Sequence, residues 1–245
     1  IDRPKKYNAL TREMYSQLAR AYYQLDQDDN LWVGVVYANG PHFTSGLELT
    51  DWAGVFTDGT GFSLNPENEI DPFYMVNDRR CSKPIIFAVQ GYCYTWGVEM
   101  MLNADIRVAA SDTRFGQLEV LRGFFPCGGG TIRLARDMGW SNAMRYLLTG
   151  DQWSADDAYR MGLVQYVTLP GKQLEKAMEL AGRVVSAAPL GVRNILKSGR
   201  LAETQGEQAA KKVIFQDVAE VMKSEDMKEG LLSFIERRKA VFKGK

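Results

Sequence analysis

The chain has 245 residues, of which 45% are hydrophobic, and its 30 Lys and Arg residues balance 30 Asp and Glu residues to a formal charge of zero. This length allows one sizeable core, so the sequence predicts one α/β domain with an appended subdomain rather than two independent domains. A neutral chain has no global field to attract nucleic acid or an anionic membrane, and it lacks a run of about eighteen apolar residues that would cross a membrane.

The cysteines are Cys81, Cys93 and Cys127, an odd number without the spacing of metal ligands. They are therefore expected to be buried thiols in a reducing compartment, and we predict a cytoplasmic protein without a metal site. The first residues, from Ile1, read as the end of a strand, so further strands are expected upstream. A targeting peptide before Ile1 stays an alternative.

The first elements follow from capping and periodicity. Thr11 is expected to cap a helix, because the next apolar residues recur at helical spacing. These residues are Met14, Leu18, Ala21, Tyr22 and Leu25. The continuous apolar run over residues 31–38 is typical of a parallel strand buried on both faces, and residues 84–93, PIIFAVQGYC, predict another strand. The sequence therefore favours a parallel sheet.

Residues 41–49, PHFTSGLEL, leave the first strand through a tight turn at Gly46. The N–H of Leu47 then either points into a cleft or belongs to a plain structural turn. Residues 54–71 are polar and rich in glycine, which predicts a mobile loop over that cleft. A short helix is expected over residues 72–78. Three apolar residues of the loop either line a pocket in that cleft or anchor the loop: Phe56, Phe62 and Leu64.

Two glutamates stand in apolar surroundings in the middle of the chain. Gly97 lies where a strand gives way to residues of helical period, so its N–H is expected among the free donors that open a helix. Glu99 lies just inside that helix, and Glu119 follows one predicted strand later, so only the fold can pair the two carboxylates. The ordinary alternatives are a solvated helical carboxylate for Glu99 and a surface ion pair with Arg122 for Glu119.

Other catalytic patterns are weaker. The glycines at 128–130 lack a phosphate-loop pattern and predict a close-packed turn. His42 is the only histidine, and a Ser-His-Asp site would require it to serve Ser45 on the same loop, which disfavours that chemistry. Cys93 has no second histidine to activate it as a nucleophile.

The second half of the chain predicts helices from residue 131 onward. Gly139, Gly150 and Gly162 read as helix stops, and Ser154 reads as the start of a helix. The last helices are expected over residues 205–222 and 225–242, and a long helical segment precedes them over 171–187.

The ordered motifs resemble those of the enoyl-CoA hydratase/isomerase (crotonase) superfamily. They are RPKKYNALT, HFTSGLEL, KPIIFAVQGYC, GVE, FGQLEV with the glycine-rich turn after it, YLLTGDQWSADDAYRMGLV and SEDMKEGLLSFIERRKAVFKGK. Each is weak alone, whereas the ordered set covers nearly the whole chain. The resemblance implies an α/β fold, a crotonase-like spiral of ββα turns over residues 1–190, followed by a C-terminal helical trimerisation region over residues 191–245.

By this resemblance, Glu99 and Glu119 match both glutamates of the family's hydratases, and the N–H groups of Leu47 and Gly97 match its oxyanion hole. The leading interpretation is hydration of a 2-enoyl-CoA to a 3-hydroxyacyl-CoA, which needs a base to activate water and an acid to protonate the adjacent carbon. No cofactor is expected, because coenzyme A is part of the substrate. The alternatives are an enoyl-CoA isomerase, a hydrolase of bulky acyl-CoA, or a non-catalytic protein that binds CoA thioesters or RNA.

The resemblance also implies where coenzyme A and partner subunits bind. The expected CoA-binding residues are Lys5, Lys6, Tyr7, Ser45, Phe242 and Lys243. Of these, Phe242 ends the expected final helix and Lys243 follows it, and both are expected to act across the interface of a homotrimer or dimer of trimers.

Three departures from the family pattern affect the expected acyl pocket. Thr95 and Trp96 replace small glycines, Leu118 replaces a proline and thereby loosens the backbone before Glu119, and Phe124 and Phe125 replace small residues. The expected pocket therefore contains Trp96, Phe124 and Phe125, and it indicates either a bulky or aromatic acyl preference or altered chemistry.

Overall fold

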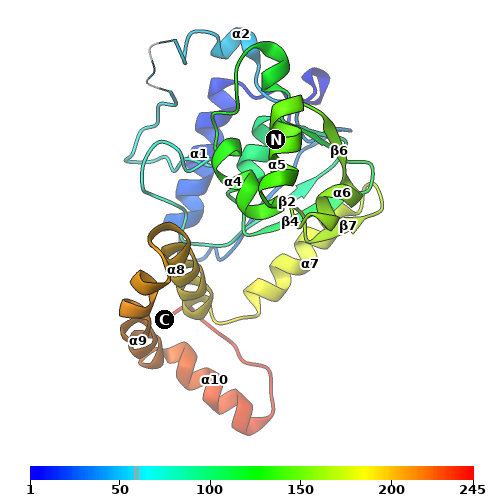
Figure 1. Cartoon of the computed structure of the whole chain (residues 1–245). Coiled ribbons are helices and arrows are strands. Elements are labelled where there is room, and N and C mark those ends of the chain that lie inside the picture. The colour runs from blue at the N-terminus through cyan, green and yellow to red at the C-terminus, as the bar shows by residue number, and fades with distance from the viewer. Residues whose placement is uncertain (58, 60) are drawn as a thin grey trace. The chain divides into compact units, whose positions relative to one another are not determined.

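The computed structural model describes residues 1–57, 59 and 61–245 (Figure 1). It forms two compact units, of which the first comprises residues 1–24, 35–80 and 85–178, and the second residues 25–34, 81–84 and 179–245. The predicted division into 1–190 and 191–245 stays a prediction. Two positions of the predicted loop over 54–71, Asp58 and Thr60, lie outside the described residues.

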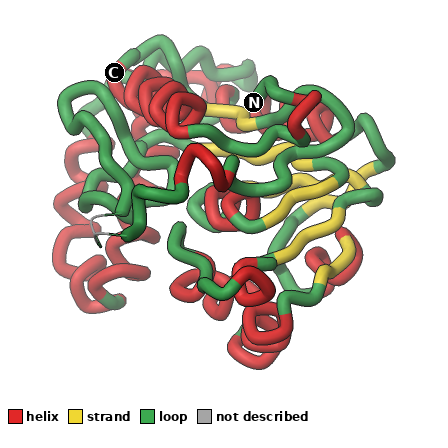
Figure 2. Tube along the Cα trace, turned by 90° about the horizontal axis from the view of Figure 1, so that it is seen from above, coloured by secondary structure: helices red, strands yellow, loops and turns green. Residues whose placement is uncertain are grey.

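The strands of the described residues form two sheets (Figure 2). The first has the order β1-β2-β4-β7, made of β1 (Gly34–Val36), β2 (Ile85–Val89), β4 (Ile106–Ala110) and β7 (Tyr166–Thr168). The second has the order β3-β5-β6, made of β3 (Tyr92–Tyr94), β5 (Arg114–Gly116) and β6 (Gln152–Ser154). β2 and β4 pair in parallel with Ile86 opposite Ile106, and every residue of β2 is buried, which confirms the predicted parallel sheet.

The strand predicted over residues 31–38 is wrong in length and burial. Only Gly34–Val36 form a strand, and the side chains of Leu31 and Tyr37 are exposed. The residues after this strand pair with Ile1 instead, whose terminal amine donates to the carbonyl of Tyr37 at 2.8 Å and whose carbonyl accepts the N–H of Asn39 at 2.9 Å.

The helices of the first unit begin and end largely where capping signals predicted. They are η1 (Pro4–Lys6), α1 (Arg12–Gln27), α2 (Leu49–Trp52), α3 (Trp96–Met101), η2 (Glu119–Arg122), α4 (Gly130–Met138), α5 (Trp140–Thr149) and α6 (Ala155–Arg160), with α7 (Gln173–Val185) and part of α1 continuing into the second unit. The Thr11 hydroxyl accepts the N–H of Met14 at 3.2 Å, and the Ser154 hydroxyl accepts that of Asp157 at 3.1 Å. Both predicted caps are therefore confirmed.

The short helix predicted over residues 72–78 is absent, because two buried ionic groups hold this segment in turns. The Asp71 carboxylate accepts the N–H groups of Phe73, Met75 and Val76 at 2.9, 2.6 and 3.1 Å. The Arg133 guanidinium donates to the carbonyls of Phe73 and Tyr74 at 2.8 and 2.9 Å. Backbone groups that a helix would pair internally are thus bound by side chains.

A cluster of aromatic rings fills the core beneath residues 95–97. The Trp96 ring lies 4.6 Å from that of Trp52, 4.7 Å from Phe73 and 4.8 Å from Phe62, all edge to face. Phe62 is buried in this cluster, so it anchors the segment that follows Thr60.

The second unit contains α8 (Pro189–Gln205) and α9 (Glu207–Met222), which lie side by side, and α10 (Glu225–Glu236) (Figure 1). The helix predicted over 225–242 is wrong beyond Glu236. The Asp226 carboxylate accepts the N–H groups of Lys243 and Gly244 at 2.7 and 2.8 Å, and Glu229 accepts that of Val241 at 2.8 Å. The tail therefore folds back onto the first turns of α10. Among the described residues, no helix has the length and apolarity that crossing a membrane requires.

Candidate active site

The N–H of Leu47 is left free by the way its segment pairs with residue 10. In a parallel bridge between Leu10 and Leu47, the N–H of Leu10 donates to the carbonyl of Gly46 at 2.8 Å, and the N–H of Glu48 donates to the carbonyl of Leu10 at 3.0 Å. The amide of Leu47 is consequently turned away from this bridge, and it donates to no group within the described residues.

Gly46 brings this segment against the start of α3. Its φ is +108°, and a Cβ at this position would lie 2.2 Å from Oγ1 of Thr95. Both observations require glycine. The turn predicted at Gly46 is therefore confirmed, and it places the amide of Leu47 near the first residues of α3.

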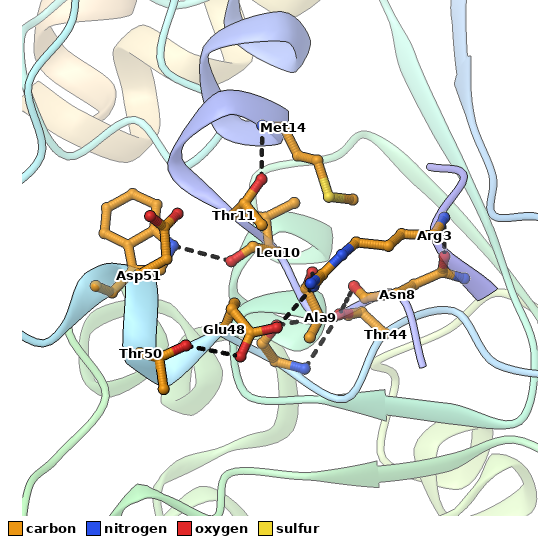
Figure 3. A network of polar contacts seen from close by, with 12 residues as sticks. Arg3, Asn8, Ala9, Leu10, Thr11, Met14, Thr44, Glu48, Thr50 and Asp51 are labelled. Carbon is orange, nitrogen blue, oxygen red and sulfur yellow. Dashed lines mark hydrogen bonds and ion pairs between the residues drawn. The ribbon is translucent and has the colours of Figure 1, made fainter. Parts of the chain in front are cut away.

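A polar network fixes the segment that carries Leu47 (Figure 3). The Arg3 guanidinium donates to the carbonyl of Ala9 at 2.9 Å and to the Glu48 carboxylate at 2.8 Å. The Thr44 hydroxyl donates to the carbonyl of Asn8 at 2.7 Å. The residues on both sides of Leu47 are thus tied to the first turns of the chain.

The N–H of Gly97 lies in the first turn of α3, which begins at Trp96. The first helical bond runs from the N–H of Glu99 to the carbonyl of Thr95 at 3.0 Å, so the amide of Gly97 has no acceptor among the described residues. A Cβ at Gly97 would lie 2.6 Å from Cγ2 of Thr44 and 3.1 Å from Sγ of Cys93. The expected free donor at a helix start is confirmed.

Thr95 holds the backbone before α3 in a strained conformation, with φ 48° and ψ −109°. Its N–H donates to the carbonyl of Gly116 at 2.7 Å, and its buried hydroxyl has no partner among the described residues. The sharp change of direction here turns the N-terminus of α3 toward residues 46–47.

Glu99 is fully buried, so the solvated carboxylate considered for it is wrong. Its Oε1 accepts the N–H groups of Gly128 and Gly130, both at 2.8 Å, and its Oε2 is buried without a partner among the described residues. Burial raises the pKa of Glu99 to about 7, although the two amides and Arg133 oppose the shift. A carboxyl group with such a pKa exchanges protons readily near neutral pH.

Glu119 opens η2 and is only 3% exposed, so the surface ion pair with Arg122 is also wrong. Burial, and next the charge of Glu99, raise the pKa of Glu119 to about 8. In the orientation that satisfies both groups, the Gln117 side-chain amide donates to both oxygens of Glu119 at 3.1 Å. Because the two carboxyl groups interact, they titrate as a pair.

Gly130 lies close to Glu99 and to the Gln117 side chain that contacts Glu119. A Cβ at this position would lie 3.1 Å from Oε1 of Glu99 and 2.7 Å from the side-chain amide of Gln117, which in turn contacts Glu119. The fold therefore gathers both predicted glutamates. The predicted close packing of the glycine turn is confirmed, but sequence reasoning missed that its amides hold Glu99, because nothing local in the sequence links residues 99 and 128.

Two cavities meet at Leu47 and Phe124. One, of about 160 Å³, is lined among others by Ser45, Trp96 and Glu119. The other, of about 390 Å³, has an apolar lining: Leu47, Leu49, Trp52, Ala53, Phe56, Phe124, Phe125 and Cys127. Each of the three predicted pocket residues therefore lines at least one cavity.

Cys127 corrects the expectation that all three cysteines are buried. Cys81 and Cys93 are buried, whereas Cys127 is half-buried and lines the apolar cavity. Proline precedes it and glycines follow it, so its side chain occupies a turn beside the carboxyl groups instead of a helix or strand interior.

The residues expected to bind coenzyme A lie in both units. Lys5, Lys6 and Tyr7 are exposed at η1, and Tyr7 stacks on His42 with 5.4 Å between ring centroids. Phe242 is half-buried and Lys243 is exposed in the tail after α10, so Phe242 does not end a helix as expected. Among the described residues, no group of three or more His, Cys, Asp or Glu side chains is arranged to hold a metal ion.

Comparison with known proteins decides the family. The sequence model of the enoyl-CoA hydratase/isomerase family matches residues 1–245. The chain belongs to this family. A crystal structure of a probable enoyl-CoA hydratase/isomerase from Mycobacterium abscessus superposes with a TM-score of 0.94 at 40% identity, over 99% of this chain and 93% of that one.

Two curated relatives of this enoyl-CoA hydratase/isomerase family member carry more specific names. Enoyl-CoA hydratase EchA19 of Mycobacterium tuberculosis is 34% identical over 100% of this chain and 92% of its own length. Mevalonyl-coenzyme A hydratase sidH of Aspergillus fumigatus is 31% identical over 98% and 88%. The expected crotonase-like α/β fold is confirmed by the structural match.

Proposed function

We propose that this family member adds water to a 2-enoyl-CoA, and that Glu99 and Glu119 carry the reaction. The observation that supports this most is the pair of buried, interacting carboxyl groups, whose pKa values are raised to about 7 and about 8. Between pH 7 and pH 8 such a pair holds close to one proton, which is the state that a combined acid and base requires. The names of the relatives support hydration over isomerisation or hydrolysis.

In the proposed reaction, the amides of Leu47 and Gly97 donate to the thioester oxygen. One ionised carboxylate accepts a proton from water as the water oxygen bonds to C3. The electrons of the C2=C3 bond move toward the thioester oxygen, where each amide contributes about 3 kcal/mol of stabilisation to the enolate. The protonated carboxyl group then delivers its proton to C2, which completes the 3-hydroxyacyl-CoA.

The apolar cavity suits an uncharged acyl group. It offers about 390 Å³ and its lining contains no charged side chain. At about 30 Å³ for each water-sized group, this volume accepts on the order of ten non-hydrogen atoms. An acyl chain ending in a carboxylate would lose its hydration there without gaining a partner, so apolar acyl groups are preferred.

The test uses Glu99→Gln and Glu119→Gln with crotonyl-CoA in heavy-oxygen water. Hydration places one heavy oxygen in the 3-hydroxyacyl-CoA, hydrolysis releases free coenzyme A, and isomerisation incorporates none. Each variant is expected to lose at least on the order of 10²-fold in turnover, because acid-base catalysis contributes that much. Glu175→Gln, an exposed carboxylate paired with Lys172, serves as the control. Unchanged turnover in either site variant would remove the assignment.

The predicted oligomer is also part of this proposal. Exposed apolar side chains gather on the second unit, where Phe215 of α9 and Phe234 of α10 are 84% and 82% exposed. Covering them in a homotrimer or dimer of trimers would remove this apolar surface from water. In such an assembly the exposed Lys243 would pair with a CoA phosphate bound to a neighbouring subunit. Light scattering of the wild type and of Phe215→Glu tests this: a wild-type monomer would contradict it.

A further inference from the structure

Cys127 is the one thiol among the described residues that lines a cavity of the candidate site. It faces the apolar cavity together with Leu47 and Phe124. The thiol is half-buried, so one side of it meets the protein interior and the other the open cavity.

Both carboxyl groups of the site affect the pKa of this thiol. Burial, and next the charge of Glu99, raise the pKa of Cys127 to about 11, and Glu119 adds to the shift. Independently, Oε2 of Glu99 is fully buried without a partner among the described residues, and a Cβ on Gly128, the neighbour of Cys127, would lie 2.8 Å from it. A proton acceptor with free lone pairs thus lies next to the residue that carries the thiol.

We propose that Cys127 adds covalently to C3 of a compact 2-enoyl thioester, in a slow side reaction of the proposed hydration site. The inference rests on the proposed function, because the same donors and acids would act. The electrophile is the substrate itself, whose C3 is electron-poor as long as the thioester oxygen is held by amide donors.

The step balances without another reagent. The S–H proton passes to a carboxylate of the pair, and the sulfur forms a bond to C3. The C2=C3 electron pair moves to the thioester oxygen, and the enolate then takes a proton at C2 from the protonated carboxyl group. The net result is the addition of S–H across the double bond, with sulfur on C3 and hydrogen on C2, as hydration adds O–H. The reverse steps release the free thiol and the enoyl thioester.

The adduct forms slowly compared with hydration. At pH 8 a thiol whose pKa is about 11 is only on the order of 10⁻³ ionised, and the thiolate is the nucleophile. Raising the pH therefore increases the rate of adduct formation. Propenoyl-CoA and crotonyl-CoA are suitable probes, because hydrogen or a methyl group on C3 leaves that carbon accessible.

The experiment incubates the wild-type chain with each probe at pH 7 and pH 9, and measures the intact mass and the modified peptide. We expect a mass increase of one whole acyl-CoA on Cys127, faster at pH 9, in wild type and in Cys81→Ser, whose cysteine is buried. Cys127→Ser and Cys127→Ala are expected to stay unmodified.

Absence of the adduct on wild-type Cys127 would overturn the inference, and so would equal modification of Cys81 or Cys93. Peptide mapping of the wild type decides this even if a variant fails to fold. Hydration is followed in the same mixtures through the 3-hydroxyacyl-CoA product. Hydration without adduct would therefore refute the thiol reaction alone, whereas adduct without hydration would refute the proposed function alone.

Discussion

Replacing Glu119 by Gln should stabilise the fold at alkaline pH. The folded protein holds the pKa of Glu119 at about 8, against an ordinary value of 4.5. Between these values the folded state binds more protons than the unfolded state, so the free energy of unfolding falls as pH rises. The full loss is at most about 5 kcal/mol, at roughly 1.4 kcal/mol for each pH unit between the two pKa values, and it is complete above pH 8.

The assay is urea unfolding of Glu119→Gln and of wild type at pH 5 and pH 9. The two proteins should have similar stability at pH 5, and the variant should be more stable at pH 9 by on the order of 2–4 kcal/mol, since structural relaxation reduces the full value. Glu99 still titrates in the variant, so a smaller dependence of stability on pH remains there. A wild-type stability that stays level from pH 5 to 9, or a variant with the same slope as wild type, would refute the burial of this carboxyl group.

Three further predictions follow from the same geometry. The pH profile of kcat/KM should be bell-shaped with limbs near 7 and 8 that belong to the carboxyl pair, and a rate that stays high to pH 10 would contradict shared acid-base work. Gly46→Ala should lower turnover by on the order of 10²-fold and lower the Tm, because the methyl group would lie 2.2 Å from a neighbouring hydroxyl at a φ of +108°, whereas Gly182→Ala in open space should do neither. Asp71→Ala should destabilise the fold by on the order of 3 kcal/mol in urea unfolding, because it leaves buried amides without an acceptor.

Features set by neighbouring residues could be predicted from the sequence. The caps at Thr11 and Ser154 and the helix stops at Gly139 and Gly150 depend on a few adjacent groups, and all lie where expected. The buried strand β2 has a composition that only a central strand tolerates. The family resemblance then supplied what spacing could not, since it alone gave Glu99 and Glu119 a reason to meet.

Features set by distant residues could not be predicted. The segment after Asp71 has helical composition, but Arg133, far along the chain, binds its carbonyls. The final residues continue a helical pattern, but Asp226 binds their amides more favourably at the start of α10. The exposure of Cys127 depends on a cavity whose walls come from residues 47–56 and 124–127. In each case a long-range polar contact or cavity overrides the local propensity.

The aromatic residues that depart from the family pattern pack beside the free amides of Leu47 and Gly97 instead of blocking them. Trp96 stands where small glycines are usual, yet its ring is buried against Trp52 and Phe73, so most of its bulk fills the core beneath the helix start. Phe124 and Phe125 lie at the exposed side of the apolar cavity. Aromatic rings therefore pack beneath the start of α3 and also line the exposed side of the cavity. Together they limit how deeply an acyl chain enters. Acyl groups that are compact, or flat enough to stack on the rim phenylalanines, should therefore give the highest kcat/KM.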